Sequence, residues 1–297
     1  MTITEPDIDI LLRDPDPRVR RAAVARVAED GLRGSGDSLA WLLADSDAGV
    51  RRAASAALRD LPEVYLGEEG VQALLLAAAR GRDGQVRTTA AELLAMLQDG
   101  ARELYAQGLH DGEPHLRVQA VLGLIVLQAV ADVAEGADDP ARDVRVAVAE
   151  GLGRLAAPAF TARPPSATVL GAEVEQVLGA LDQLITDHDP VVRMAALDAA
   201  ASLGLPEPLD ARAVVATAHS SWQVRRRAVA ALGTASPEVA IAPLVAALRD
   251  RIVDVRRAAV QSLERWATAE PEAVTALTES LNDPDPGVRT QARWALA

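Results

Sequence analysis

The chain of 297 residues contains no cysteine and no lysine, and aromatic residues make up only 2% of it. Without cysteine, a disulfide framework, a thiolate-ligated metal site and a cysteine nucleophile are all excluded. No run of 18 apolar residues occurs, so the sequence predicts no membrane-spanning segment. The first residues lack a basic segment followed by an apolar one, so we expect no secretion signal and a cytoplasmic protein.

The short motifs of common enzymes are missing as well. A phosphate-binding GxxxxGK[ST] loop needs lysine, and neither HExxH nor G-x-S-x-G occurs. His110 and His115 flank Asp111 and Glu113, a set that suits a metal ion, but histidines in surface turns are commoner than metal ligands. The sequence therefore predicts no catalytic residue, no metal and no cofactor.

Alanine and acidic residues are what the chain has in excess. Alanine fills 61 positions, which favours helices and lets neighbouring helices approach closely. The 43 acidic residues outnumber the 30 basic ones, all of them arginine, and the net charge is -13. Nucleic acid rewards cationic surfaces, so this balance disfavours a nucleic-acid partner.

One pattern occurs nine times: an acidic turn, then an aliphatic residue and an arginine, then an alanine-rich apolar segment, as in DPDPRVRRAAVARV. We call the arginines of this pattern the anchor arginines; they are Arg20, Arg51, Arg87, Arg117, Arg145, Arg193, Arg225, Arg256 and Arg289. Seven of their eight spacings lie near 31 residues. That length accommodates two short helices and two turns, so each repeat is predicted to be a helical hairpin.

The turn before each anchor arginine has the chemistry of a helix start. An acidic residue stands four positions before the arginine at Asp16, Asp47, Asp83, Glu113, Asp189 and Asp285. A carboxylate there is predicted to cap the free N–H groups of the second helix. Proline follows at Pro17, Pro114, Pro190 and Pro286, as expected for a first helical position. Apolar residues at helical spacing, such as Val19, Ala23, Val24 and Val27, then predict a buried stripe.

This pattern is similar to HEAT repeats of the short, phycobilisome-lyase-like subtype, over about residues 8–297. The resemblance implies an all-α fold, a right-handed α-solenoid of about nine HEAT-like helical hairpins. It also implies that second helices line a concave face and that an Asp–Arg ladder joins adjacent repeats. By that resemblance the nine anchor arginines are structural rungs that pair with acidic turn residues.

Two places depart from the repeat. One spacing is 48 residues, and the surplus predicts a proline-containing inserted loop at 158–172, between repeats one to five (1–157) and repeats six to nine (173–297). The loop is interpreted either as a surface loop or as a lid or partner-binding loop. The seventh repeat has His219-Ser220-Ser221-Trp222 in place of the acidic turn, so its cap and rung are expected to differ.

If the second helices line a groove, the residues one and five positions after each anchor arginine should face it. We predict a partner-binding row that is basic at its ends and apolar and acidic at its centre: Arg21, Arg52, Glu92, Val118, Leu122, Val146, Glu150, Met194, Asp198, Arg226 and Arg257. Such a groove suits a peptide or helix with basic and apolar residues. The alternative is that these residues pack against neighbouring helices and complete the core.

The predicted function is a non-enzymatic scaffold or adaptor that binds a protein or peptide partner along the concave face. Two alternatives come from enzymes with HEAT-like helices. One is a phycobilin-lyase-like or chaperone-like protein that acts on a protein-bound cofactor. The other is a DNA-binding or alkylpurine-glycosylase-like DNA-repair protein, since arginine pairs such as Arg256 and Arg257 suit phosphates. A hydroxylase of the deoxyhypusine type is disfavoured, because its iron is held by His-Glu dipeptides and none occurs here.

Overall fold

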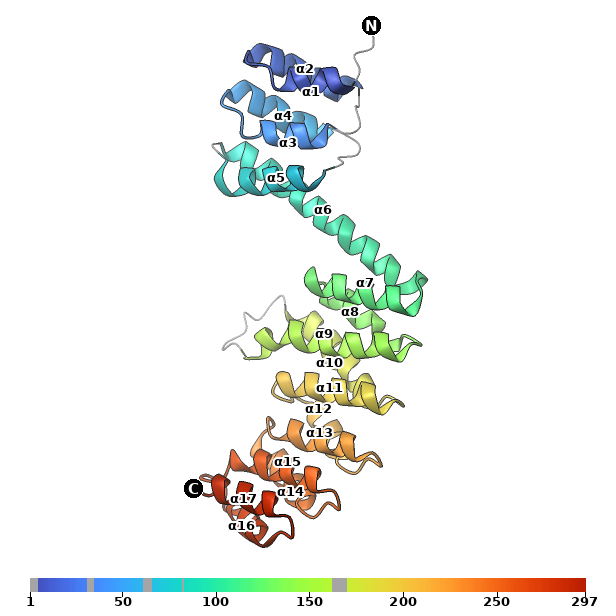
Figure 1. Cartoon of the computed structure of the whole chain (residues 1–297), viewed down its shortest axis with the longest axis vertical. Coiled ribbons are helices and arrows are strands. Elements are labelled where there is room, and N and C mark those ends of the chain that lie inside the picture. Colours follow the sequence, from blue (N-terminus) through green and yellow to red (C-terminus); the bar gives the residue numbers. More distant parts are fainter. Residues whose placement is uncertain (1–4, 31–34, 61–65, 82, 162–169) are drawn as a thin grey trace. The chain divides into compact units, whose positions relative to one another are not determined.

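The computed structural model describes residues 5–30, 35–60, 66–81, 83–161 and 170–297 (Figure 1). Within these residues the secondary structure consists of α-helices and two short 3₁₀ helices, with no strand. The helices are α1 (Glu5–Leu12), α2 (Pro17–Asp30), α3 (Gly36–Leu42), α4 (Ala48–Asp60), α5 (Glu68–Arg80), α6 (Gly84–Asp111), α7 (Pro114–Val126), α8 (Val130–Glu135), η1 (Gly136–Asp138), α9 (Arg142–Thr161), α10 (Leu170–Ile185), α11 (Pro190–Ser202), α12 (Leu209–Ala216), α13 (Trp222–Leu232), α14 (Pro237–Ala247), α15 (Val253–Glu264), α16 (Pro271–Glu279), η2 (Ser280–Asn282) and α17 (Pro286–Ala295). The predicted all-α fold of about nine helical hairpins is confirmed.

The chain forms two compact units, Met1–Ala101 and Arg102–Ala297. The first holds α1 to α5 and the beginning of α6, and the second holds the rest of α6 and all later helices. The boundary lies within α6 rather than at the break in repeat spacing. The predicted division of the repeats at 158–172 stays a prediction.

The helices on either side of the predicted inserted loop extend into it. Helix α9 continues to Thr161 and α10 begins at Leu170, so the predicted boundaries 158 and 172 fall inside helical segments. The remaining residues, 162–169, lie outside the described part of the chain.

The predicted helix starts are observed where the turn has its full chemistry. Helices α2, α7, α11 and α17 each begin at the predicted proline. Asp189 Oδ1 accepts the Val191 N–H at 2.7 Å, and Asp285 Oδ1 accepts the Val288 N–H at 2.9 Å. Glu113 precedes α7 without a side-chain capping bond, because its longer side chain does not replace the short aspartate as a cap.

The core of each unit is built from the predicted apolar stripes. In the first unit Ala23, Val24 and Val27 are at most 2% exposed. In the second unit, second helices pack against second helices in the order α7, α9, α11, α13, α15, α17, while α10, α12, α14 and α16 form the other layer (Figure 1). Adjacent repeats therefore share long, thin interfaces, and the stability of each unit is a sum of many nearest-neighbour terms.

Helix α6 departs from the two-helix repeat. Its 28 residues combine the second helix of the third repeat and the first helix of the fourth, which the spacing predicts as separate helices. The intervening sequence contains Gly100 and no proline. A glycine inside a helix costs only about 1 kcal/mol relative to alanine, and this is too little to force a turn.

Candidate functional site

Six anchor arginines form ion pairs with an aspartate of the following repeat. The pairs are Arg20–Asp45, Arg51–Asp83, Arg117–Asp139, Arg145–Asp187, Arg225–Asp250 and Arg256–Asp283. In the fork at Arg145, Nε and Nη2 donate to the two Asp187 oxygens at 2.7 and 3.1 Å. Nη1 donates backwards to the carbonyl of Asp139 at 2.7 Å. Each such arginine thus links its own turn to the next repeat.

The aspartates of the ladder stand six residues before the next anchor arginine at five of the six pairs, the exception being Asp83. The capping aspartates stand four residues before it, so one turn uses two acids for two tasks. Asp187 also accepts the N–H of Asp189 at 2.8 Å, and this bond fixes its carboxylate toward Arg145. Sequence reasoning missed the position, although the Asp-x-Asp spacing of the turns was visible.

Four of the ladder carboxylates, those of Asp139, Asp187, Asp250 and Asp283, are held in their charged form. Burial alone would raise the pKa of Asp187, but the hydrogen bonds from Arg145 and from the Asp189 N–H outweigh it and lower that pKa. Asp139 and Asp283 have lowered pKa values for the same balance of reasons. The hydrogen bond from Arg225 lowers the pKa of Asp250. These acids have the electrostatics of structural ion pairs rather than of proton donors.

Three anchor arginines have no such pair within the described residues. Arg87 donates to the Gly81 carbonyl at 2.9 Å, and Arg289 donates to the Asp283 carbonyl at 2.7 Å. Arg193 donates to the carbonyls of Asp187 and Thr186. In the repeat after Arg193, the ladder position is occupied by His219, whose Nδ1 accepts the Ser221 N–H at 3.0 Å. The seventh repeat therefore keeps the turn and lacks the carboxylate.

The first unit holds three residues of the predicted partner-binding row, and all three are exposed. Arg21 and Arg52 curl back onto the carbonyls of Pro17 and Ala48 at 3.4 and 3.3 Å. Glu92 lies 3.4 Å from Arg59. These residues lie at the surface of successive second helices without forming a described pocket.

The second unit holds the other eight. Leu122, Glu150, Asp198 and Arg226 are exposed, whereas four are half-buried: Val118, Val146, Met194 and Arg257. The three apolar members of that half-buried set pack against the core of the unit. For them the core-completing alternative holds in part. Arg257 also forms an ion pair with the capping Asp285 at 2.9 Å.

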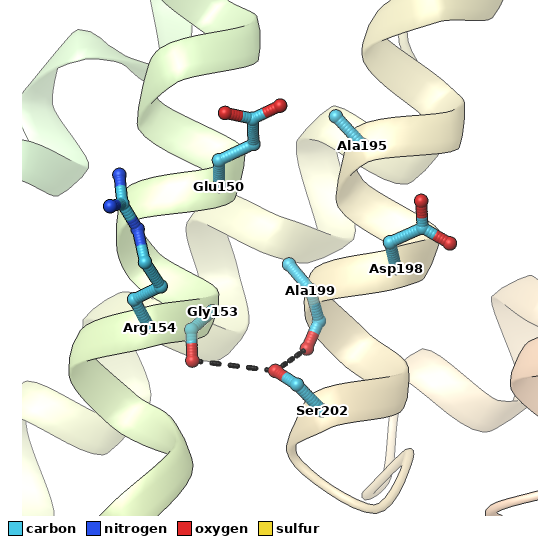
Figure 2. Close-up of a pocket in the computed structure, with 7 residues that line it drawn as sticks. All are labelled: Glu150, Gly153, Arg154, Ala195, Asp198, Ala199 and Ser202. Carbon is cyan, nitrogen blue, oxygen red and sulfur yellow. Dashed lines mark hydrogen bonds between the residues drawn. The ribbon is translucent and has the colours of Figure 1, made fainter.

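Two residues of the row, Glu150 and Asp198, line one pocket between α9 and α11 (Figure 2). Its volume is about 450 Å³. The full lining is Glu150, Gly153, Arg154, Ala195, Asp198, Ala199 and Ser202. Sequence reasoning missed five of these, although four of them lie three or four positions from Glu150 or Asp198 on the same helix faces and Ala199 directly follows Asp198.

The pocket is hollow because its floor is made of small residues. A Cβ on Gly153 would lie 2.9 Å from both Cα and Cβ of Ala199, so glycine is required for this approach of α9 to α11. The Ser202 hydroxyl donates to the Ala199 carbonyl at 2.6 Å, with the Gly153 carbonyl at 3.3 Å (Figure 2). The serine is thus bonded within the floor, and the longer side chains stand around it.

The rim of the pocket carries incompletely neutralised carboxylates. Burial raises the pKa of Asp198, and the nearby charge of Glu150 adds to this, against the lowering effect of Arg227 and Arg226. Arg227 on α13 lies 3.1 Å from the Asp198 carboxylate. The Glu150 carboxylate has no hydrogen bond or ion pair to the rest of the described chain. The pocket therefore has acceptor capacity to spare.

No three metal-capable side chains come together in the part of the chain that the structure describes. His110, proposed as a possible ligand, lies 3.5 Å from Glu135. None of the described helices is both long and apolar enough to cross a membrane.

The family model for HEAT repeats matches residues 4–95 and 209–297. A search of curated proteins finds no match. Among solved structures, that of Kap95p with RanGDP is 13% identical over 99% of this chain and 45% of that chain, with a TM-score of 0.50. An engineered protein is 18% identical over 97% of this chain and 86% of its own, with a TM-score of 0.45.

A structure of importin beta is 16% identical over 98% of this chain and 46% of that chain, with a TM-score of 0.48. The chain spans a little under half the length of the matched chains in the Kap95p and importin beta structures. At these identities the similarity concerns the fold alone.

Proposed function

The chain belongs to the HEAT-repeat proteins, and from that premise we propose that it is a non-enzymatic scaffold or adaptor. It binds a protein or peptide partner along the face formed by its second helices. We call the part of this face with Leu122, Val126, Glu150 and Asp198 the inner face. The partner segment carries basic and apolar residues.

The observation that carries this proposal is the pattern of exposed side chains on α7, α9 and α11. Leu122 and Val126 lie one turn apart on α7 and are 39% and 80% exposed. The carboxylates of Glu150 and Asp198 follow on the next two second helices. Apolar groups beside carboxylates suit a segment that combines apolar and basic residues.

The fold supports the proposal in a general way. Stacked helical repeats form extended surfaces that bind other chains. Kap95p, whose structure has a similar fold, binds the protein RanGDP. The likeness suggests a class of function, and the partner of this chain is defined by its own surface chemistry.

The proposal is tested by affinity capture with a matched pair of variants. The double variant Leu122→Asp/Val126→Asp places charges on the inner face. The control Val215→Asp alters a valine that is 72% exposed on α12, a helix of the layer formed by α10, α12, α14 and α16. Wild type and control should capture the same protein from a native lysate, and the purified protein should bind both with equal affinity by calorimetry.

The inner-face variant should lose this partner while its circular dichroism melt stays close to that of the wild type. Capture of the same partner by all three chains would contradict the proposal. Equal loss in the control would show that the loss is not specific to the inner face, and this result would also contradict the proposal.

A further inference from the structure

We propose that the pocket between α9 and α11 binds the side chain of an arginine in the partner polypeptide. This inference rests on the proposed function and names the chemistry of one contact in it. The aliphatic part of the arginine lies on the floor of Gly153, Ala195 and Ala199. Its guanidinium lies between the carboxylates of Glu150 and Asp198.

The shape of the pocket fits a long, thin side chain. With only small residues in its floor, a volume of about 450 Å³ stays open toward the inner face. Arginine covers apolar surface with its methylene groups while its head reaches polar groups. The floor offers the methyl groups of Ala195 and Ala199 to the methylenes, and the rim carries the carboxylates of Glu150 on α9 and Asp198 on α11, the latter turned away from α9 toward its partner Arg227 (Figure 2).

The charges of the rim favour a cation. The Glu150 carboxylate has no ion pair within the described chain, and Asp198 forms an ion pair with Arg227 alone among the described side chains, while the charge of Arg226 acts on it from further away. A carboxylate has about four acceptor sites on two oxygens, so Asp198 keeps capacity for a second guanidinium. Partial burial and the charge of Glu150 raise the pKa of Asp198 more than Arg227 and Arg226 lower it, so a further cation would stabilise the charged carboxylate.

Arg154 also lines the pocket and opposes a cation there. It lies one helical turn after Glu150, so the two side chains provide a matched pair of opposite charge at one site. A cationic ligand is stabilised by Glu150 and destabilised by Arg154. An anionic ligand would show the reverse dependence.

A polypeptide is a better occupant than a free small molecule because apolar side chains that could contact further residues of a chain lie around the pocket. Val146 and Met194 stand one turn before the two carboxylates and are half-buried, and Leu122 and Val126 are exposed on α7. A chain whose arginine enters the pocket places its neighbouring residues over these apolar groups. The occupant is therefore an arginine with apolar neighbours in sequence.

The test uses the full chain with ¹³C-labelled alanine methyl groups and the blocked peptide Ac-Ala-Arg-Ala-NH₂ as the probe. Saturable NMR shifts are expected at the methyls of Ala195 and Ala199 and not at Ala273, which is buried in α16. The same peptide with citrulline, an uncharged isostere of arginine, should bind about tenfold more weakly because charged hydrogen bonds are lost.

Three variants sharpen the result. Glu150→Gln should weaken binding of the arginine peptide by about tenfold, whereas Arg154→Gln should strengthen it severalfold. Glu264→Gln, at an exposed glutamate of α15, should leave the affinity unchanged. All three sites are exposed, so thermal melts should match that of the wild type.

Absence of shifts at Ala195 and Ala199, equal binding of the citrulline peptide, or weaker binding to Arg154→Gln would each overturn the proposal. If the pocket fails while the wild-type chain still captures its partner through Leu122 and Val126, the scaffold function stands. If the peptide binds as expected but the inner-face variant still captures the partner, the proposed binding through Leu122 and Val126 fails and the pocket chemistry stands.

Discussion

Two neighbouring interfaces between second helices of the second unit differ at one ladder position. They are α9–α11 and α11–α13, and we call them joints. At the first joint, Arg145 and Asp187 form a two-bond fork with side chains only 6% and 9% exposed. At the second, Arg193 turns back to carbonyls of its own turn, and His219 stands where the next carboxylate belongs. The turn survives this exchange because an imidazole nitrogen accepts the same backbone N–H. Capping the turn and pairing with the preceding repeat are therefore separable tasks.

The second joint has weaker connections of other kinds. Arg227 on α13 pairs with Asp198 on α11, and Arg212 on α12 pairs with Asp182 on α10 at 2.6 and 3.0 Å. The side chains of both pairs are exposed by about a quarter to a half. Exposed pairs contribute at most about 1 kcal/mol. We therefore expect α11–α13 to open more readily than α9–α11.

The largest expected effect on the free energy of unfolding is that of low pH. The pKa values of Asp139, Asp187, Asp250 and Asp283 are lowered in the folded chain. The unfolded chain thus binds these protons more readily than the folded one. Their stabilisation is present above the ordinary aspartate pKa of 3.8 and is lost as pH falls below it, toward the folded values.

Urea unfolding from pH 7 down to pH 3 measures this loss, and hydrogen exchange locates it. The midpoint should fall steeply below about pH 4, and amides of α9 should lose more protection than those of α13. An unchanged midpoint across this range would mean that the ladder carboxylates contribute nothing to the free energy of unfolding.

Asp187→Asn should be the most destabilising single change at the strong joint. The amide keeps the shape and an acceptor for the Asp189 N–H but leaves the buried Arg145 guanidinium without a counter-charge. Removing one partner of a buried pair costs about 3 kcal/mol or more, measured as the change in the free energy of urea unfolding at pH 7. A loss below about 1 kcal/mol would show that this pair behaves as a surface pair.

His219→Asp should strengthen the weak joint. The aspartate restores the carboxylate opposite Arg193 and keeps an acceptor for the Ser221 N–H, so we expect a gain of about 1 kcal/mol in the free energy of unfolding. His219→Asn controls for the turn alone. The gain should vanish when Arg193→Gln is added, as a double-mutant cycle measures. An equal gain in the asparagine variant would refute the missing pair as the cause.

Arg212→Gln should have the smallest effect. The Arg212 side chain is 48% exposed, and solvent and salt screen such a pair, so the loss should stay below about 1 kcal/mol. Unfolding measured at low and at high salt checks this, because high salt should reduce even this small difference between the variant and the wild type. A loss as large as that of Asp187→Asn would show that burial does not decide the strength of these pairs.

The sequence predicted the regular part of this molecule because that part is repeated chemistry. Pro190 and Asp189 start α11 as expected, and Ala23, Val24 and Val27 are buried as their spacing indicates. The carboxylate partner of each arginine was harder to assign. Two acids in one turn look equivalent in a sequence, and only the folded turn directs Asp187 toward Arg145 and Asp189 toward its helix.

The candidate site was predicted in part. Glu150 and Asp198 follow from their positions after the anchor arginines, and the structure places both on one pocket. The hollow itself arises from what Gly153, Ala195 and Ala199 lack, and small residues are common throughout this alanine-rich chain. Which of them meet across two helices depends on the close approach of α9 and α11.

Every rung of the ladder runs in one direction, from an arginine to the aspartate of the following repeat. A gene duplication or deletion that adds or removes one whole repeat therefore joins an arginine to an equivalent aspartate. Such a chain changes length without a new interface having to evolve. The seventh repeat is an exception, since each extra copy of it would bring another His219 and leave one more arginine facing no carboxylate.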